Sequence, residues 1–215
     1  VVDDLRYFTP GTSPCVIDVD GGRVGVTICE DAWHRGPVNQ AAGAGADVVV
    51  NLNASPFDHY KSAARESVLR DRVAETGLPI LYCNMAGGQD EVVYDGGSCA
   101  FDGNGDLMVR APHFDTGLHP VDVECIHGRW TPLEGAIEPS LSPEAVGYEA
   151  LGWGVRDYVE QNGISRVVLG LSGGVGSALV TCLAADAPGP ERVHCLLMPT
   201  RYPADLRPTA AAGLA

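Results

Sequence analysis

Residues 15–33, Cys-Val-Ile-Asp-Val-Asp-Gly-Gly-Arg-Val-Gly-Val-Thr-Ile-Cys-Glu-Asp-Ala-Trp, decide the fold of the first part of this chain. Two short apolar runs, Cys15–Val19 and Arg23–Ile28, flank Asp20-Gly21-Gly22, which is typical of the turn of a β-hairpin. Cys29 follows the second run directly. We therefore predict a hairpin whose second strand is buried and ends at a cysteine.

Strands and helices alternate in the residues that follow. Asp47–Leu52 and Leu78–Asn84 are continuous apolar runs with the length of buried strands. Pro37–Gly45 has Pro at its start and Gly near its end, as short helices do. Asp58–Thr76 is rich in helix-forming residues, and Gly77 is expected to end it. This alternation predicts an α/β fold or a layered α-β-β-α domain.

Glycine-rich turns predict two further β-hairpins. Val92–Tyr94 and Ser98–Phe101 are short strand-like runs, and Asp95-Gly96-Gly97 lies between them as a possible turn. A second turn is indicated by Gly103-Asn104-Gly105. Both hairpins would belong to the same domain as Cys29.

The composition changes in residues 127–142, which are rich in Pro and Gly. We interpret this stretch as a linker that follows a first domain of residues 1–126 and precedes a second domain of residues 143–215. The chain also starts at Val1 without an initiator Met, so we expect the first domain to be truncated at its N-terminus.

The second domain is predicted to begin with a helix, Pro143–Gln161, that is capped by Ser142 and ended by Asn162-Gly163. Apolar residues recur along it at helical spacing, namely Tyr148, Leu151, Val155 and Tyr158. The next predicted elements are the strand Arg166–Leu169, a Gly/Ser loop, the helix Ala178–Ala187 and the strand Arg192–Met198. This β-loop-α-β order is the opening of a doubly wound nucleotide-binding domain.

The last residues break this pattern. Pro203–Ala215 is rich in Pro and Ala and continues neither a strand nor a helix pattern. Because a doubly wound domain cannot close on two strands and two helices, we expect the second domain to be truncated.

Charge and cysteine usage limit the possible partners. The net charge is −14, from 28 acidic and 14 basic side chains, and such a surface repels nucleic acid and anionic lipid. No run approaches the roughly 18 apolar residues of a membrane span. The seven cysteines form no C-x-x-C pair, which indicates a reducing, cytoplasmic location and argues against a zinc site.

Chemistry alone leaves two interpretations of Cys29. A cysteine where the backbone turns sharply after a strand can expose its sulfur and serve acyl transfer as a nucleophile, with backbone N–H groups stabilising the oxyanion. A cysteine with no catalytic role is more often a small buried core residue.

The sequence around Cys29 resembles the nitrilase superfamily, and in particular the glutaminase domain of glutamine-dependent NAD synthetases. The resemblance extends over nearly the whole chain to about Arg201. It rests on four motifs, namely Arg6–Gly11, Gly25–Trp33, Asn53-Ala-Ser-Pro56 and Asp95-Gly-Gly-Ser98. It implies a nitrilase-like α-β-β-α sandwich.

The resemblance also implies roles for single residues. Cys29 is then the nucleophile that forms a glutamyl thioester and releases ammonia, and Ser55 and Lys61 hold the substrate glutamine. The family's other two catalytic residues are a Glu base and a Lys that supports the oxyanion. Both are expected upstream of Val1, because Lys61 is the only lysine of the chain and lies in another motif.

The Gly/Ser loop is the candidate nucleotide site, formed by Gly170, Leu171, Ser172, Gly173, Gly174, Val175, Gly176 and Ser177. Small residues ahead of a helix let backbone N–H groups approach phosphate oxygens. The same residues would also be expected in a tight turn that binds no ligand. The loop lacks the Gly-Lys-Ser/Thr of a Walker A motif. It resembles the Ser-Gly-Gly-x-Asp-Ser pyrophosphate loop of ATP pyrophosphatases, with Gly176 in place of the Asp. Leu197–Tyr202 resembles the next strand end in NAD synthetases.

The resemblance implies ATP-dependent amidation of deamido-NAD to NAD with ammonia from glutamine. It implies ATP and Mg²⁺ as co-substrates, no prosthetic group and, for an intact protein, a homo-oligomer. Two alternatives stay open. One is a stand-alone nitrilase-type amidase, which would need neither the linker nor the second domain. The other is an inactive remnant, suggested by Gly176 and by the irregular last residues.

Overall fold

The structure is a computed structural model that describes residues 6–126 and 129–198. The chain divides into two compact units, one from residues 1–86 and 95–140 and the other from residues 87–94 and 141–215. Residues 203–215, and residues 199–202 of the Leu197–Tyr202 motif, lie outside the described residues. No helix in the described ranges has the length and apolar character that a membrane crossing requires.

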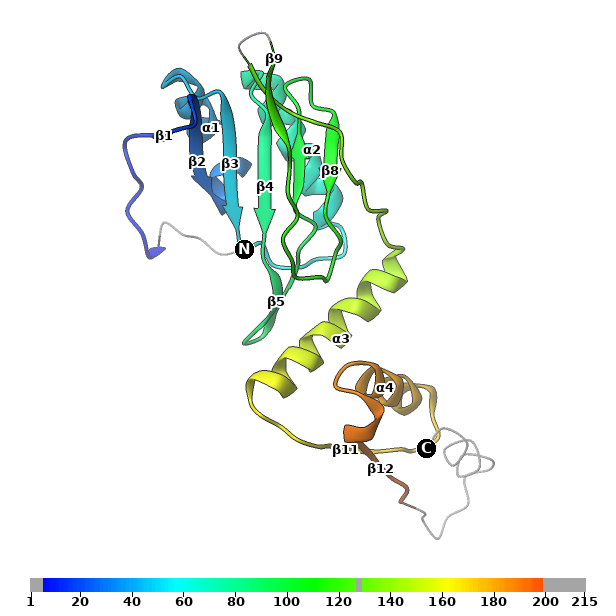
Figure 1. The fold of residues 1–215 in the computed structure, drawn as a ribbon. Helices are drawn as coiled ribbons and strands as arrows, with labels where there is room; N and C mark the ends of the chain where they lie inside the picture. Colours follow the sequence, from blue (N-terminus) through cyan, green and yellow to red (C-terminus); the bar gives the residue numbers. More distant parts are fainter. Residues whose placement is uncertain (1–5, 127–128, 199–215) are drawn as a thin grey trace. The chain divides into compact units, whose positions relative to one another are not determined.

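A six-stranded mixed sheet forms the centre of the first unit, in the order β1-β2-β3-β4-β7-β8 (Figure 1). The strands β2, β3 and β4 are parallel, and the other neighbours are antiparallel. The strands are β1 (Cys15–Val19), β2 (Gly22–Ile28), β3 (Val48–Asn53), β4 (Ile80–Asn84), β7 (Cys99–Phe101) and β8 (Leu107–Arg110). The hairpin at Gly103-Asn104-Gly105 is thereby confirmed.

The hairpin around Asp20 is confirmed, with its second strand starting at Gly22. Asp20 and Gly21 are left-handed, with φ values of +47° and +84°. A two-residue hairpin turn needs these conformations to match the right-handed twist of its strands. Val19 pairs with Gly22, so the turn fixes the register of β1 on β2.

Two helices, α1 (Arg35–Gly43) and α2 (Lys61–Thr76), cover one face of the sheet (Figure 1). Their apolar side chains pack with alternate residues of the strands, in a core that includes Val38, Val49, Leu69, Val73, Ile80 and Phe101. The described residues thus supply one helical layer and one large β layer of the α-β-β-α arrangement. The helix α2 starts later than Asp58, because the Asp58 carboxylate accepts the N–H of Tyr60 in the preceding turn.

The predicted pairing across Asp95-Gly96-Gly97 is wrong. The strand β6 (Val92–Asp95) pairs with β5 (Ala86–Gln89), whereas β7 pairs with β4 and β8. Asp90, with a φ of +53°, lies in the turn of the β5–β6 hairpin. Gly96 and Gly97 instead lead the chain from one sheet into the other, and both are left-handed, with φ values of +63° and +64°.

The interval that we assign to a linker contains a strand. β10 (Arg129–Pro132) pairs with β9 (Val123–Ile126) in an antiparallel two-stranded sheet, and both strands belong to the first unit. The boundary between the compact units falls at Ser140, close to the end of residues 127–142.

The second unit has the predicted β-loop-α-β order after its first helix. Its elements are α3 (Pro143–Gln161), β11 (Val167–Gly170), α4 (Val175–Asp186), a 3₁₀ turn (Pro190–Arg192) and β12 (Val193–Leu196). The Ser142 hydroxyl accepts the Ala145 N–H at 3.2 Å and caps α3 as predicted. The strands β11 and β12 are parallel, with Val167 opposite Val193.

Candidate active site

The candidate residues of the first unit meet at one edge of its sheet. Ile28 on β2 is opposite Leu52 on β3, and Asn53 on β3 is opposite Asn84 on β4. Because the three strands are parallel, the residues that follow them emerge at the same edge. Cys29 follows β2 there, and Ser55 follows β3 two residues beyond the end of that strand.

Cys29 has a left-handed backbone, with a φ of +43°. It is partly exposed and begins the 3₁₀ turn η2 (Cys29–Trp33), which is held by a hydrogen bond of 2.9 Å from the Ile28 N–H to the Asp31 carboxylate. Non-glycine residues rarely adopt this conformation. Asp20 and Asp90 adopt it in hairpin turns, whereas Cys29 adopts it directly after a parallel strand, where backbone strain often accompanies a functional site. A nucleophile on a strained turn between a strand and a helix has this geometry.

Lys61 lies beside the Cys29 segment. It is the first residue of α2, and its Nζ atom is 6.0 Å from the centroid of the Trp33 ring, at the end of η2. Ser55 lies deeper: it is 1% exposed, and its N–H donates to Asn84 Oδ1 at 3.0 Å. The structure therefore brings Cys29, Ser55 and Lys61 to one edge, with the serine side chain behind the surface.

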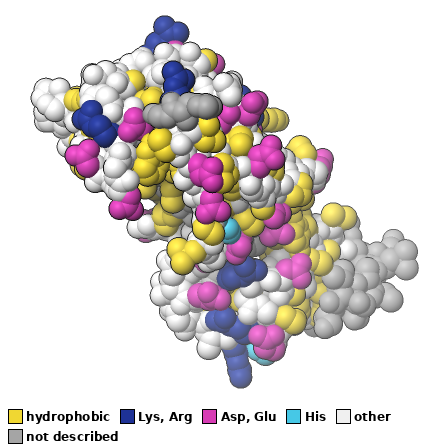
Figure 2. All heavy atoms as spheres, turned by 45° about the horizontal axis from the view of Figure 1, so that its top comes forward, with side chains coloured by type: hydrophobic (Ala, Val, Ile, Leu, Met, Phe, Trp, Pro, Cys, Tyr) yellow, Lys and Arg dark blue, Asp and Glu magenta, His cyan; other side chains and the backbone are white. Residues whose placement is uncertain are grey.

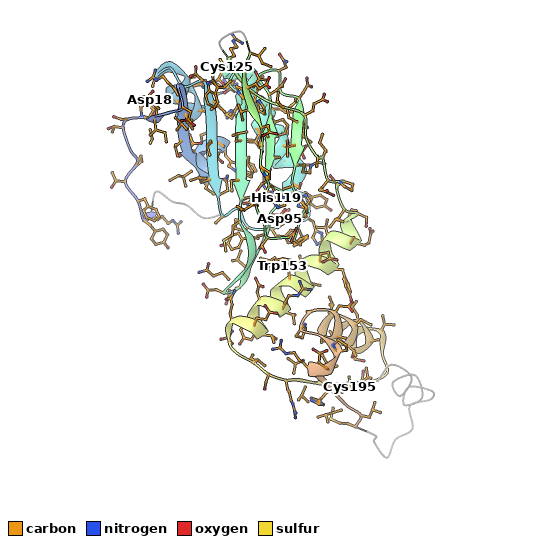
Figure 3. The ribbon with its side chains drawn as sticks, viewed as in Figure 1. Asp18, Asp95, His119, Cys125, Trp153 and Cys195 are labelled. Atoms are coloured by element: carbon orange, nitrogen blue, oxygen red, sulfur yellow. The ribbon has the colours of Figure 1, made fainter. Side chains whose placement is uncertain are left out.

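A buried charged cluster behind Ser55 was missed by sequence reasoning; we name Arg65, Asp95, Asn84 and His113 the Arg65 cluster. The Arg65 guanidinium donates to the two Asp95 oxygens at 3.0 and 3.4 Å, and one of its nitrogens lies 3.5 Å from the Ser55 hydroxyl. Asn84 donates to the same carboxylate at 3.4 Å, and His113 Nδ1 lies 3.4 Å from it. Figure 3 shows Asp95 at the end of the sheet toward which β3 and β4 run.

The cluster keeps two opposite charges in the protein interior. Burial raises the pKa of Asp95, but the hydrogen bond from His113 and the charge of Arg65 outweigh it, so that the pKa lies below its ordinary value. Burial would lower the pKa of Arg65, and the Asp95 carboxylate raises it above its ordinary value. Beside them, burial raises the pKa of Tyr82 to about 12. Asp95 and Arg65 are thus held in their ionised forms.

One sequence signal could have revealed Arg65. It lies at helical spacing from Leu69 and Val73, which are core residues of α2, so it occupies the same buried face. A cation on the apolar face of a helix needs a buried partner. Asp95 supplies that partner, and it is part of the Asp95-Gly-Gly-Ser98 motif.

Buried amides continue this polar layer below the edge. The Asn51 side chain donates to the Thr27 hydroxyl at 2.8 Å, and the Asn53 side chain donates to Asn51 Oδ1 at 2.6 Å. Asn53 Oδ1 is itself buried without a hydrogen-bond partner among the described residues. The helix-covered face of the sheet is therefore apolar in its middle and polar at the edge that carries Cys29.

Gly97 is expected to be essential for the packing of His113. Its φ is +64°, and an added Cβ would overlap the His113 ring. Gly97→Ala is therefore expected to lower the free energy of unfolding by about 2–4 kcal/mol, from backbone strain plus a steric clash.

The matched control is Gly77→Ala at the end of α2. Gly77 has a φ of +69° but open space around its Cα, so only the strain of about 1–2 kcal/mol applies. Urea denaturation measures both variants. Equal losses of unfolding free energy in Gly97→Ala and Gly77→Ala would mean that the His113 ring moves aside without an energetic cost.

The Gly/Ser loop of the second unit is shorter than predicted. The helix α4 starts at Val175 rather than Ala178, because the Ser177 hydroxyl closes the first turn by donating to the Gly174 carbonyl at 2.9 Å and accepting the Ser172 N–H at 3.2 Å. Gly173 has a φ of +78°. The loop presents N–H and hydroxyl groups at a helix N-terminus, which suits phosphate oxygens.

Gly176 is exposed in the first turn of α4, and an added Cβ would meet no atom within 4 Å. An aspartate would fit at this position. Residues 170–177 contain no carboxylate, so this loop lacks the charged oxygen ligand through which proteins usually bind Mg²⁺.

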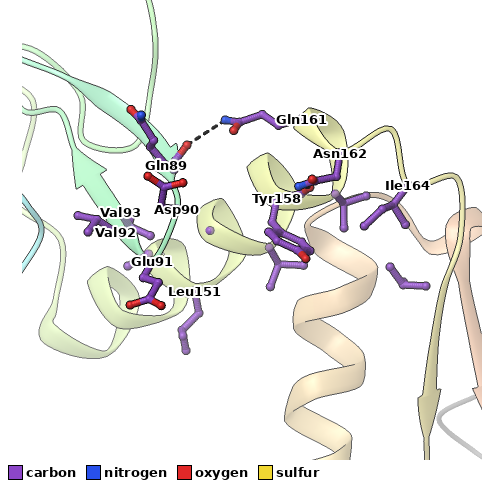
Figure 4. Close-up of a pocket in the computed structure, with 16 residues that line it drawn as sticks. Gln89, Asp90, Glu91, Val92, Val93, Leu151, Tyr158, Gln161, Asn162 and Ile164 are labelled. Carbon is purple, nitrogen blue, oxygen red and sulfur yellow. Dashed lines mark hydrogen bonds between the residues drawn. The ribbon is translucent and has the colours of Figure 1, made fainter.

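The second unit also has a groove of about 810 Å³ between the β5–β6 hairpin and α3 (Figure 4). Leu151 and Tyr158, which we place on an apolar helical stripe, are 58% and 62% exposed and line this groove. Gln161 bridges the two elements by donating to the Gly88 carbonyl at 2.9 Å. None of the candidate site residues lines it.

The first unit carries a thiol on a strained turn after a parallel strand, beside a lysine and a buried polar layer. This arrangement is that of a nitrilase-type hydrolase. The second unit carries a nucleotide-type loop. The family comparison agrees with this class. The carbon-nitrogen hydrolase model matches residues 4–125, and the chain belongs to that family. The NAD synthase model matches residues 148–215.

Individual relatives match this chain across both parts. The chain is 42% identical to a glutamine-dependent NAD(+) synthetase of Xylella fastidiosa over 214 residues, and 40% identical to that of Rhodobacter capsulatus over 215 residues. These matches cover 99% and 100% of this chain and 39% of each relative. The chain thus spans about two fifths of their length, and the resemblance found from its motifs is confirmed.

A solved structure shares the fold of the whole chain. It is the glutamine-dependent NAD+ synthetase of Acinetobacter baumannii in complex with ADP, with a TM-score of 0.90 and 37% identity. The match covers 99% of this chain and 40% of that one. The α/β fold, with a nitrilase-like unit before the start of a nucleotide-binding domain, is thereby confirmed.

Proposed function

We propose that this chain carries the glutamine-hydrolysing site and the first nucleotide-binding unit of an enzyme that amidates deamido-NAD to NAD. The observation that carries the proposal is Cys29, held at a φ of +43° at the sheet edge that also carries Ser55 and Lys61. The name of the relatives, glutamine-dependent NAD(+) synthetase, supports glutamine and NAD as the small molecules involved.

In the glutaminase step, the Cys29 thiolate attacks the side-chain carboxamide carbon of glutamine. The carbon–nitrogen bond breaks, the nitrogen takes up a proton and leaves as ammonia, and a thioester remains on the sulfur. Water then hydrolyses the thioester to glutamate and restores the thiol. Lys61 offers a positive charge for the glutamine carboxylate at the mouth of this site.

In the second step, the carboxylate of deamido-NAD attacks the α-phosphorus of ATP and pyrophosphate leaves, which forms an acyl adenylate. Ammonia then attacks the acyl carbon, loses a proton and displaces AMP to give the amide of NAD. The N–H and hydroxyl groups of residues 170–177 would hold the phosphates of ATP. Because residues 170–177 carry no carboxylate for Mg²⁺, we assign this loop phosphate binding alone. The relative with bound ADP supports an adenine nucleotide as the ligand.

The surface supports small-molecule substrates rather than nucleic acid or lipid. Figure 2 shows acidic side chains spread over much of the visible face, with basic ones between them. We further propose a cytoplasmic location, no prosthetic group and a homo-oligomer for the intact protein.

The test of the function uses a chimera in which this chain replaces the matching 214 residues of the Xylella fastidiosa relative. The chimera is expected to release ammonia from glutamine. The 215-residue chain alone is expected to show negligible release, because its only lysine is Lys61 and the Glu and Lys implied by the resemblance are not among its residues. Ammonia release from the chain alone that disappears in Cys29→Ala would contradict the expectation that catalysis needs a Glu and a Lys from outside these 215 residues.

Gly176→Asp in the same chimera is expected to raise NAD formation from deamido-NAD, ATP and ammonia by about tenfold, or about 1.4 kcal/mol in the activation free energy. An aspartate at the second position of α4 interacts favourably with the helix dipole and removes the flexibility of glycine. Gly176→Asn is the matched control without the charge. An unchanged rate in Gly176→Asp would mean that this carboxylate is dispensable.

A further inference from the structure

We infer that Arg65 and Asp95 are positioning residues for the glutamine site, acting through Ser55 and the first turn of α2. The inference rests on the proposed function, because it names residues that organise that same site. Neither residue is expected to touch glutamine, since their side chains are only 3% and 5% exposed.

The first step concerns the segment between β3 and α2, residues 54–60, which carries Ser55 and leads into Lys61. This segment must have one rigid conformation if Ser55 and Lys61 are to keep a constant position relative to Cys29. Two hydrogen bonds hold Ser55, from its N–H to Asn84 Oδ1 at 3.0 Å and from Arg65 to its hydroxyl at 3.5 Å. Both partners belong to the Arg65 cluster.

The second step concerns Asp95, on which the cluster converges. Its carboxylate accepts from Arg65 and Asn84, and His113 lies against it. Asn84 also donates to the Gly96 carbonyl at 2.9 Å, and its own N–H donates to the Ser98 hydroxyl at 2.9 Å. Asp95 therefore orients both groups that hold Ser55, and the Asp95-Gly-Gly-Ser98 segment anchors them to the sheet.

The third step concerns Lys61. Arg65 is one helical turn after Lys61 on α2, so both side chains lie on neighbouring parts of one helix face. Anchoring Arg65 on Asp95 fixes the first turn of α2. The fixed turn holds Lys61 beside Trp33 of the Cys29 segment, 6.0 Å from the ring centroid.

A second buried arginine on the same helix provides a matched control. Arg72 is 7% exposed and pairs with Glu75 at 2.9 Å, within α2 and away from Ser55. Arg65→Lys and Arg72→Lys both keep the charge and lose the planar fork of the guanidinium. A structural role alone predicts similar effects of the two substitutions.

The first measurement is amide hydrogen exchange by NMR in the 215-residue chain, with global stability determined by urea denaturation for each variant. Exchange of the Ser55 amide is expected to speed up about tenfold in Arg65→Lys relative to Arg72→Lys, after correction for global stability. Equal exchange in the two variants would overturn the inference whatever the protein binds.

The second measurement is the dissociation constant of glutamine, determined by calorimetry for the same variants in the chimera with Cys29→Ala, which supplies the upstream residues of the site and does not hydrolyse the ligand. We expect about a tenfold increase in Arg65→Lys and in Asp95→Asn, no change in Arg72→Lys, and little further increase when Arg65→Lys is added to Ser55→Ala. If Arg65→Lys and Ser55→Ala instead have additive effects on the free energy of glutamine binding, Arg65 does not act through Ser55. Absence of glutamine binding to the chimera with Cys29→Ala alone would refute the proposed function, whereas a changed Ser55 exchange would still establish the positioning of Ser55.

Discussion

Arg65→Ala is expected to lower the free energy of unfolding of the first unit by about 3–5 kcal/mol, because removing one partner of a buried ion pair leaves the other charge uncompensated. The Arg65 and Asp95 side chains are 3% and 5% exposed, so water cannot replace the lost guanidinium. Urea denaturation, followed by tryptophan fluorescence, measures the effect.

The control for this prediction is Arg70→Ala on the same helix. Arg70 is 45% exposed and pairs at 3.0 Å with Glu66, which also pairs with Arg110. Its removal therefore leaves no uncompensated charge and is expected to cost about 0.2–1 kcal/mol. The double variant Arg65→Met with Asp95→Asn is expected to recover much of the loss, since no buried charge remains. A loss in Arg65→Ala no larger than in Arg70→Ala would show that the pair is not buried in solution.

Cys29→Ala is expected to reduce ammonia release from glutamine in the chimera by about 10⁴-fold or more, because the nucleophile of a covalent mechanism has no substitute. The folding of the chimera should be unaffected, since Cys29 lies at the surface of the sheet edge and is partly exposed. Ammonia release and thermal unfolding are measured on the same samples.

Cys29→Gly separates the role of the thiol from the strain in its backbone. At a φ of +43° a glycine is unstrained, so this variant is expected to be about 1 kcal/mol more stable than Cys29→Ala and equally inactive. Equal stability of the two variants would mean that the backbone relaxes when the cysteine is replaced. Residual activity within tenfold of the wild type in either variant would remove Cys29 from the mechanism.

Elements with local start and stop signals were predicted most closely from the sequence. The helix Pro143–Gln161 has its observed bounds, because its Ser142 cap and the Asn162-Gly163 stop act within one turn of the helix. The hairpin at Asp20-Gly21 was equally predictable, since the turn conformation itself fixes the register of its strands.

Pairing between distant strands was not predictable in the same way. Val92–Asp95 could pair with either neighbouring strand, and nothing local distinguishes Ala86–Gln89 from Cys99–Phe101. The chain places Cys99–Phe101 in the large sheet, where Phe101 is fully buried against Ile80. Tertiary burial decided this pairing.

The candidate site was predicted in part. The resemblance led to Cys29, Ser55 and Lys61, which the fold brings to one edge. The Arg65 cluster was missed because its four members come from four separate segments, and a charged residue in a helix is ordinarily taken as exposed. The burial of Arg65 follows from its spacing, but its partner Asp95 is known only from the fold.

The most direct test of the central claim is covalent labelling of the chimera with a diazoketone analogue of glutamine, mapped by mass spectrometry. We predict that the label attaches to Cys29 and that glutamine suppresses it. The exposed cysteines Cys15 and Cys83 serve as internal controls and should stay unlabelled. Labelling of Cys15 and Cys83 to the same extent as Cys29, without suppression by glutamine, would contradict the assignment of Cys29 as the nucleophile of a glutamine site.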